Sequence, residues 1–169
     1  MPLASETIAT ERLRLEPLRA EDADEMAAVL NDERLYEFTG GAPPALPVLR
    51  ERYAALAAGS EKTNVHWLNW IVRLQNDASA IGTLQATITN GSDGVTALVA
   101  WVIGVPWQSR GYATEAARAL VAWLRTRGAQ TILANVHPDH LASAKVAERT
   151  GFEPTDEEAN GERIWRARG

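Results

Sequence analysis

One segment connects the most apolar run of the chain to its clearest helical pattern, and it reads Val105-Pro106-Trp107-Gln108-Ser109-Arg110-Gly111-Tyr112-Ala113-Thr114. The first N–H groups of a helix have no partners within the helix, and the aligned peptide dipoles leave about half a positive charge at that end. An anion is therefore favoured there. Gly111 permits a positive φ or a close backbone approach, while Gln108 and Arg110 carry donors suited to phosphate oxygens. We predict that this turn holds a pyrophosphate.

A plainer interpretation of the same turn stays open. In it Gly111 only redirects the chain and Arg110 is a solvated surface charge, because short glycine motifs often recur by chance. Two other nucleotide motifs are absent from the sequence, namely G-x-x-x-x-G-K-[ST] and a G-x-G-x-x-G that follows a strand. A phosphate at this turn would therefore be held without a P-loop lysine.

The segment before the turn has the pattern of an antiparallel meander. Residues 67–75 and 82–89 alternate apolar and polar side chains, as strands with unlike faces do. Turn signals at 76–77 and 90–94 separate these strands from each other and from the next. Residues 95–103 are almost continuously apolar, which predicts a central strand covered on both faces.

The segment after the turn alternates between helix and strand. Residues 114–127 form the best amphipathic helix, with Gly128 suited to its cap, and a strand at 131–136 follows. Strand, helix, strand implies a parallel crossover. We expect further strands at 12–16 and 162–166, further helices at 20–30, 48–58 and 140–150, a loop at 38–47, and a solvated turn at Asp156-Glu157-Glu158. Together these elements predict an α+β fold with a mixed, mostly antiparallel sheet and helices on its faces.

Length and composition limit the classes of function. A chain of 169 residues with 46% hydrophobic content predicts a single domain over 1–169, with 1–9 as a loose N-terminal segment. The net charge of −5 argues against nucleic acid as a partner. Cysteine is absent, which excludes disulfides, thiolate metal sites and a thiol intermediate. Because no uncharged apolar stretch reaches about 20 residues, we expect no membrane partner and a cytoplasmic location.

Residues in four places resemble a known family. The run Gln108-Ser109-Arg110-Gly111-Tyr112-Ala113 matches the Q/R-x-x-G-x-G/A signature of the GNAT acetyltransferase superfamily, after a buried strand and before an Ala-rich helix. The other stretches resemble its RimJ/RimL-type branch, and they are Thr10-Glu11-Arg12-Leu13-Arg14-Leu15, Ile81-Gly82-Thr83, and Ser143 through Gly151-Phe152. The resemblance covers about residues 10–166. It implies a central twisted sheet of six to seven strands flanked by about four helices.

The resemblance also implies acetyl-coenzyme A as the co-substrate. In the family, backbone groups at the end of the fourth strand meet the pantetheine arm, and the matching residues here are Ile103, Gly104 and Val105. The pyrophosphate would be held by Gln108, Ser109, Arg110, Gly111, Tyr112, Ala113 and Thr114. The later helix of the family begins with Asn-x-x-Ser near the cofactor. In this chain these positions are His140 and Ser143.

The resemblance further implies direct attack by an amine on the thioester in a ternary complex, with no metal. The proton carriers that are usual in the family are missing from this chain. Many relatives have a Glu in the fourth strand and a Tyr in the later helix, where this chain has Leu98 and Ala147. An α-amino group with a pKa of about 7.7 to 8.0 loses its proton at pH 7 for roughly 1 kcal/mol, whereas a lysine-like amine needs about 4 to 5. A weak base therefore suffices for a protein N-terminus.

The segment His137-Pro138-Asp139-His140 offers replacements for the missing groups. Histidine exchanges protons near pH 7, so we expect His137 or His140 to assist proton transfer, with Asp139 orienting one of them and Ser143 as a third candidate. The alternative is that Asp139 only caps the helix and the histidines are ordinary loop residues.

The acceptor stays open from sequence, because acceptor pockets depend on loop shape. Tyr36, Glu37 and Phe38, with the Gly/Pro-rich stretch 38–47, are expected to border the acceptor pocket, unless this is an ordinary surface loop. Protein N-terminus, polyamine, antibiotic and amino acid are all compatible, and relatives often pair as homodimers. Two alternatives to an enzyme are a catalytically weak acyl-coenzyme A sensor with the same fold and a nucleotide-binding regulator.

Overall fold

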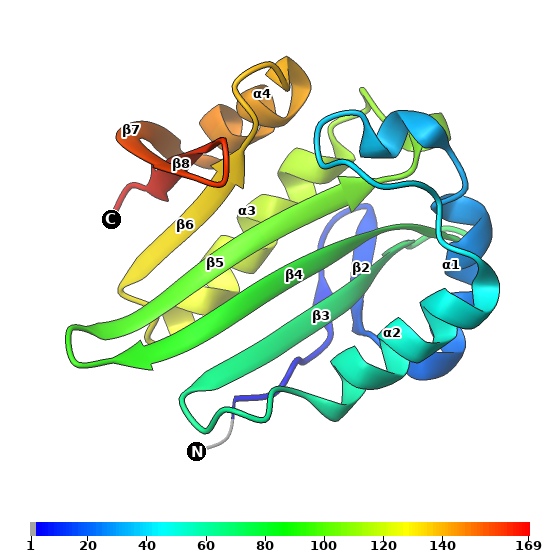
Figure 1. The fold of residues 1–169 in the computed structure, drawn as a ribbon, viewed down its shortest axis with the longest axis horizontal. Helices are drawn as coiled ribbons and strands as arrows, with labels where there is room; N and C mark the ends of the chain where they lie inside the picture. The colour runs from blue at the N-terminus through cyan, green and yellow to red at the C-terminus, as the bar shows by residue number, and fades with distance from the viewer. Residues whose placement is uncertain (1–2) are drawn as a thin grey trace.

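The computed structural model describes residues 3–169 and contains one eight-stranded sheet in the order β1-β2-β3-β4-β5-β6-β8-β7 (Figure 1). Its strands are β1 Ile8–Ala9, β2 Leu13–Pro17, β3 Val65–Leu74, β4 Ala80–Gly91, β5 Gly94–Ile103, β6 Thr131–Val136, β7 Phe152–Ala159 and β8 Glu162–Ala167. Neighbouring strands run antiparallel except β5 and β6, which are parallel, as the crossover predicts. The α+β class is confirmed, with slightly more strands than the expected six to seven.

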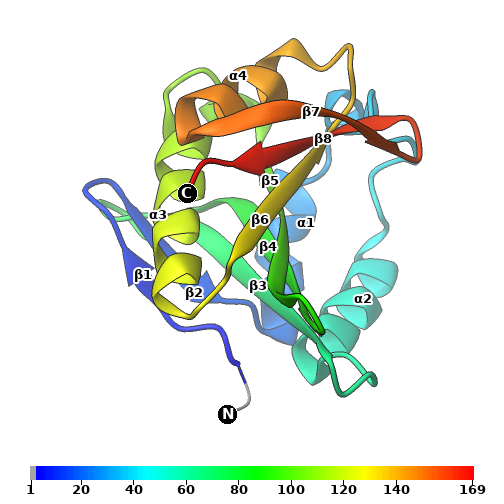
Figure 2. The ribbon, with the colours of Figure 1, turned by 90° about the vertical axis from the view of Figure 1, so that its left-hand side faces the viewer.

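The helices lie on both faces of this sheet. They are α1 Ala23–Val29, α2 Leu46–Ala58, α3 Tyr112–Thr126 and α4 Leu141–Thr150, joined by the short 3-10 turns η1 Ala20–Asp22, η2 Glu33–Tyr36 and η3 Val105–Trp107. Figure 2 shows α3 on one face and α1 and α2 on the other. Within residues 3–169, no helix combines the length and the apolar character that crossing a membrane requires.

The centre of β3 is buried on both of its faces. Trp70 is fully buried on the α3 face and meets Trp123 edge to face, with ring centroids 5.4 Å apart. Ile71 is buried on the opposite face, in a separate cluster with Met26 of α1 and Leu49 of α2. Because successive side chains of a strand point to opposite faces, helices on both sides bury the whole centre of β3.

The prediction that residues 95–103 are covered on both faces is wrong. In β5, Ala97 and Val99 are buried, but Leu98 and Val102 on the other face are each 37% exposed. The helical pair α1 and α2 contacts β3 and β4, while α3 contacts β5 from the opposite side. The open face of β5 is therefore apolar without being covered.

Two further expectations are corrected. The segment 1–9 was expected to be loose, but Ile8–Ala9 pairs with β2, and the Trp70 indole N–H donates to the Glu6 carbonyl over 2.8 Å. Residues 1–2 lie outside the described residues. The acids 156–158 were expected in a turn, yet they belong to β7, where the register with β8 shifts between Pro154 and Glu158. This irregularity at a sheet edge keeps the acidic side chains exposed to solvent.

Candidate functional site

A gap opens in the sheet where β5 and β6 separate. The parallel pairing joins Thr96–Val99 to Thr131–Ala134 and ends there, although both strands continue. A cavity of about 1010 Å³ lies at this point. The second half of β5, the end of β6, the starts of α3 and α4, and the segment 34–39 form its walls. The edge of β5 beyond Val99 is thus open for a ligand to lie along it.

The predicted phosphate turn forms one end of the cavity. Gly111 has a φ of 83° and is the N-cap of α3, and Ser109 also has a positive φ, of 62°. The first α3 hydrogen bond runs from the Glu115 N–H to the Gly111 carbonyl. Among the hydrogen bonds of residues 3–169, none uses the N–H groups of 111–114. They form a set of unpaired donors at a helix start, where an anion is favoured.

The other residues expected to bind the cofactor divide into two groups. Those that line the cavity are Ile103, Val105, Gln108, Ser109, Gly111, Ala113 and Thr114. Gly104, Arg110 and Tyr112 lie away from it. Gly104 is packed so closely that an added Cβ would be 2.9 Å from Trp107 and from Val29. The Tyr112 ring lies under the Arg12 guanidinium, 4.4 Å from its carbon.

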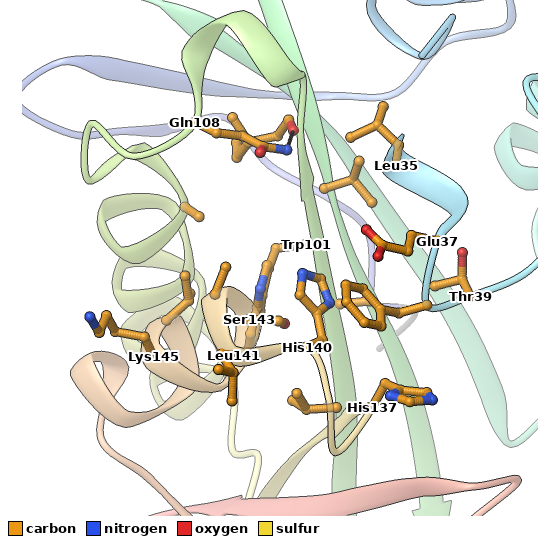
Figure 3. A pocket seen from close by; sticks show the side chains of 18 of the residues that line it. Leu35, Glu37, Thr39, Trp101, Gln108, His137, His140, Leu141, Ser143 and Lys145 are labelled. Carbon is orange, nitrogen blue, oxygen red and sulfur yellow. Dashed lines mark hydrogen bonds between the residues drawn. The ribbon is translucent and has the colours of Figure 1, made fainter. Parts of the chain in front are cut away.

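The side chain of Gln108 has an intramolecular partner. Its Nε2 donates to the Ile103 carbonyl over 2.8 Å, so it links the turn to the last residue of β5. Figure 3 shows Gln108 at one end of the cavity and Leu141 and Lys145 toward the other. The Gln108 amide therefore acts first on the shape of the turn, a role that its residue type alone did not predict.

The opposite wall carries the two histidines. His137 follows β6, and its Nδ1 accepts the Asp139 N–H over 3.1 Å. His140 is the N-cap of α4, but no side chain caps this helix, so the interpretation of Asp139 as a cap is wrong. The Asp139 carboxylate is highly exposed and lies 4.0 Å from the His137 Nδ1, so it is His137 that Asp139 contacts.

Phe38 belongs to the segment 36–38, which was expected to border the acceptor pocket, and its ring contacts both histidines of this wall. Its ring stacks on His140 at a centroid distance of 4.5 Å and meets His137 at 5.4 Å. The pKa of His140 lies below its ordinary value because burial penalises the imidazolium, and the nearby His137 adds to this effect while Glu37 opposes it. The His140 ring is therefore neutral at pH 7 and available to accept a proton.

Of the remaining predicted residues, some line the cavity and one does not. Glu37, Phe38 and Ser143 line the cavity, as do the unpredicted Asn135 and Lys145. Tyr36 does not, because its hydroxyl donates to the Leu30 carbonyl over 3.0 Å. The period-two pattern of β6, which exposes Asn135 on the side opposite to Ala134, was the available signal for Asn135.

The two positions without the usual proton carriers differ in their surroundings. Leu98 lies on the open face of β5 and lines the cavity. Ala147 is the fully buried residue of α4 and does not line the cavity. The cavity floor is consequently apolar at the point where many relatives of the resembled family place a carboxylate.

Comparisons with known proteins agree with this geometry. Residues 12–153 match the family model described as "Acetyltransferase (GNAT) domain". A search of curated protein sequences finds no significant match. Among solved structures, an acetyltransferase from Agrobacterium tumefaciens is 26% identical, covers 100% of this chain and 98% of its own, and superposes with a TM-score of 0.73.

Two other structures are similar in fold at lower identity. One is RimL, the ribosomal L7/L12 alpha-N-protein acetyltransferase, in complex with coenzyme A, at 15% identity, 95% and 97% coverage of this chain and of that one, and a TM-score of 0.78. The other is AAC(6')-Ib in complex with paromomycin and acetyl-coenzyme A, at 20% identity, 92% coverage of each chain and a TM-score of 0.74.

Proposed function

The chain belongs to the GNAT acetyltransferase family, and we propose that it transfers the acetyl group of acetyl-coenzyme A to a primary amine by direct attack in a ternary complex. The observation that carries this proposal is the cavity between β5 and β6, which has unpaired N–H groups of 111–114 at one end and the half-buried His140 in its wall. The binding of coenzyme A by RimL and of acetyl-coenzyme A by AAC(6')-Ib supports it.

In this proposal the cofactor lies along the open edge of β5. The pantetheine arm lies beside the end of β5, where Ile103 and Val105 line the cavity, and pairs with the open main-chain edge of that strand as an added strand would. The diphosphate accepts hydrogen bonds from the N–H groups of Gly111 to Thr114, with Ser109 beside them. Ser143 and the start of α4 close the other side.

The chemistry then needs one proton acceptor and one group to stabilise the oxyanion. The amine nitrogen attacks the thioester carbon, a main-chain N–H of β5 donates to the oxyanion, and the C–S bond breaks to release the thiolate. The attacking amine gives up its proton to His140, directly or through water, and the Ser143 hydroxyl, which lines the cavity, donates to the thiolate. A neutral, weakly basic imidazole suits an α-amino group better than a lysine-like amine.

The acceptor side of the cavity favours an amine attached to an apolar group. Leu98 and Val102 provide an apolar floor on the open face of β5, and Glu37 places a carboxylate at its border. A carboxylate attracts an ammonium group, and the floor can cover an aliphatic side chain. A protein or peptide N-terminus combines both features.

The test is the release of free coenzyme A from acetyl-coenzyme A across panels of peptides, polyamines, aminoglycosides and amino acids. A thiol reagent detects the released coenzyme A without reacting with the protein, because the chain has no cysteine. Turnover with one amine class supports the proposal. Binding of acetyl-coenzyme A without release on any amine would indicate the sensor function instead, and no binding would end the proposal.

A further inference from the structure

The back of the phosphate turn is held by a single arginine. The Nε atom of Arg12 lies 2.7 Å from the Oε1 atom of Glu115, and its Nη1 atom donates to the Arg110 carbonyl over 2.9 Å. The same guanidinium covers the Tyr112 ring at 4.4 Å. Arg12 therefore contacts three residues of 110–115 at once, although it lies almost a hundred positions earlier in the chain.

Glu115 is held from the same side by two more donors. The Thr10 hydroxyl donates to its Oε2 atom over 2.5 Å, and the Arg12 main-chain N–H donates to that oxygen over 3.0 Å. Partial burial opposes ionisation of Glu115, but the hydrogen bonds from Thr10 and Arg12 outweigh it, so its pKa lies below the ordinary value. We call Thr10, Arg12 and Glu115 the turn clamp.

The turn needs such support because its backbone is strained. Ser109 has a φ of 62°, a left-handed conformation that is unfavourable for a non-glycine residue because Cβ crowds the neighbouring carbonyl. Such conformations persist where surrounding contacts enforce them. The hydrogen bond from Arg12 to the Arg110 carbonyl holds the peptide that joins Arg110 to Gly111, between the two positive-φ residues Ser109 and Gly111.

The clamp leaves the ligand side of the turn free. The cavity is lined by Ser109, Gly111, Ala113 and Thr114, whereas Arg12 of the clamp contacts Arg110, Tyr112 and Glu115. In addition, Arg12 compensates the negative charge of Glu115 close to the site proposed for a diphosphate. The clamp can thus shape the turn and neutralise an unfavourable charge without occupying the site.

We propose that Thr10, Arg12 and Glu115 are positioning residues that hold the turn 109–114 in the conformation that binds the diphosphate of coenzyme A. This inference rests on the proposed function. Because the clamp acts on the turn and not on the reacting atoms, its loss weakens the binding of acetyl-coenzyme A. The KM for acetyl-coenzyme A therefore rises, whereas kcat and the KM for the amine stay the same.

The first experiment compares Arg12→Ala with Arg14→Ala in the 169-residue chain. Arg14 lies two residues further along the chain, in β2, and its ion pair is with the half-exposed Glu16, away from the turn, so it is a matched control. Calorimetric titration with coenzyme A is expected to show a Kd at least about tenfold higher for Arg12→Ala, since this variant loses the two hydrogen bonds that the charged guanidinium donates to Glu115 and to the Arg110 carbonyl. Arg14→Ala is expected to keep the wild-type Kd.

The second experiment tests whether the clamp acts as a unit. Residues of one network have non-additive effects, so the double variant Arg12→Ala/Glu115→Ala should bind coenzyme A about as well as Arg12→Ala alone. If the two single effects simply multiply, or if the Kd of Arg12→Ala stays within about twofold of wild type, the inference is overturned.

Separate controls distinguish a loss of folding, and a failure of the proposed function, from a loss of binding. Melting temperatures are measured for every variant, and if Arg12→Ala does not fold, Thr10→Val carries the test with an expected rise in Kd of about threefold, the size of one modest net hydrogen bond. An unchanged Kd in Thr10→Val would then overturn the inference. A wild-type protein that binds no coenzyme A would instead refute the proposed function.

Discussion

At the scale of single residues, the proposed chemistry depends on His140. Its ring stacks on Phe38, lines the cavity and is kept neutral by burial. His137 also lines the cavity, but its Nδ1 already accepts the Asp139 N–H. The two histidines therefore differ in their freedom to accept a proton, even though they are three positions apart in the same loop.

We expect His140→Ala to lower kcat by about 100-fold, the lower end of what a positioned general base contributes. His137→Ala is the matched control. Its expected loss of kcat is less than about tenfold, because the His137 ring accepts the Asp139 N–H and so supports the loop. Initial rates at saturating acetyl-coenzyme A measure both variants. Equal losses in the two, or no loss in His140→Ala, would contradict the assignment.

The pH dependence follows from the same residue. Because the pKa of His140 lies below 6.5, the ring is unprotonated at pH 7, and kcat should stay level as the pH falls until it reaches that pKa. Below it His140 takes up a proton and kcat decreases. A kcat profile from about pH 5 to 8 measures this limb, which should disappear in His140→Gln. A limb centred above pH 6.5 would point to another group.

At the scale of elements, the phosphate turn and β5 show what a sequence pattern can and cannot predict. The turn was predictable because Gly111 and the amphipathic helix after it are local features. The exposure of β5 was not, since an apolar run looks the same whether a helix covers it or a ligand site leaves it open. Likewise, nothing near Arg12 in the sequence indicates that it contacts Glu115.

The phosphate turn allows a test with a matched glycine. Gly111→Ala must adopt a φ of 83° and place its Cβ 3.3 Å from the Nη2 atom of Arg12, so we expect a Kd for coenzyme A at least about fivefold higher, given a left-handed cost of about 1 to 2 kcal/mol. Gly128 has a φ of 88° with no atom within 4 Å of an added Cβ. Gly128→Ala should therefore lose similar stability but keep the Kd, and equal Kd changes would argue against a binding role for the turn.

The open face of β5 allows a change of acceptor preference. Leu98→Glu places a carboxylate in the cavity, and partial exposure of this position makes the charge tolerable. We expect kcat/KM for lysine-like amines to rise at least about tenfold relative to α-amines, because a local carboxylate favours and then deprotonates the more basic amine. Leu98→Gln controls for polarity alone. An unchanged ratio would show that the acceptor does not approach this face.

At the scale of the whole molecule, the cavity lies between two parts of the sheet. One part contains β1 to β5 with α1 and α2, and the other contains β6, β8 and β7 with α4. They are connected through the short parallel pairing of β5 with β6 and through the packing of α3 against α4. A cofactor that touches β5, α3 and α4 would join the two parts, and so it should stabilise the entire fold.

Acetyl-coenzyme A is therefore expected to raise the melting temperature of the whole protein. A ligand at about 100 times its Kd stabilises the folded state by about 2.7 kcal/mol, and each kcal/mol shifts the Tm of a chain of this size by about 2 to 4 °C. The expected shift is about 5 to 10 °C. ATP has an adenosine and phosphates but no pantetheine to lie along β5, so at equal concentration its shift should be smaller. A shift with ATP and none with acetyl-coenzyme A would instead identify a nucleotide-binding protein, since the turn 109–114 would then act without the edge of β5.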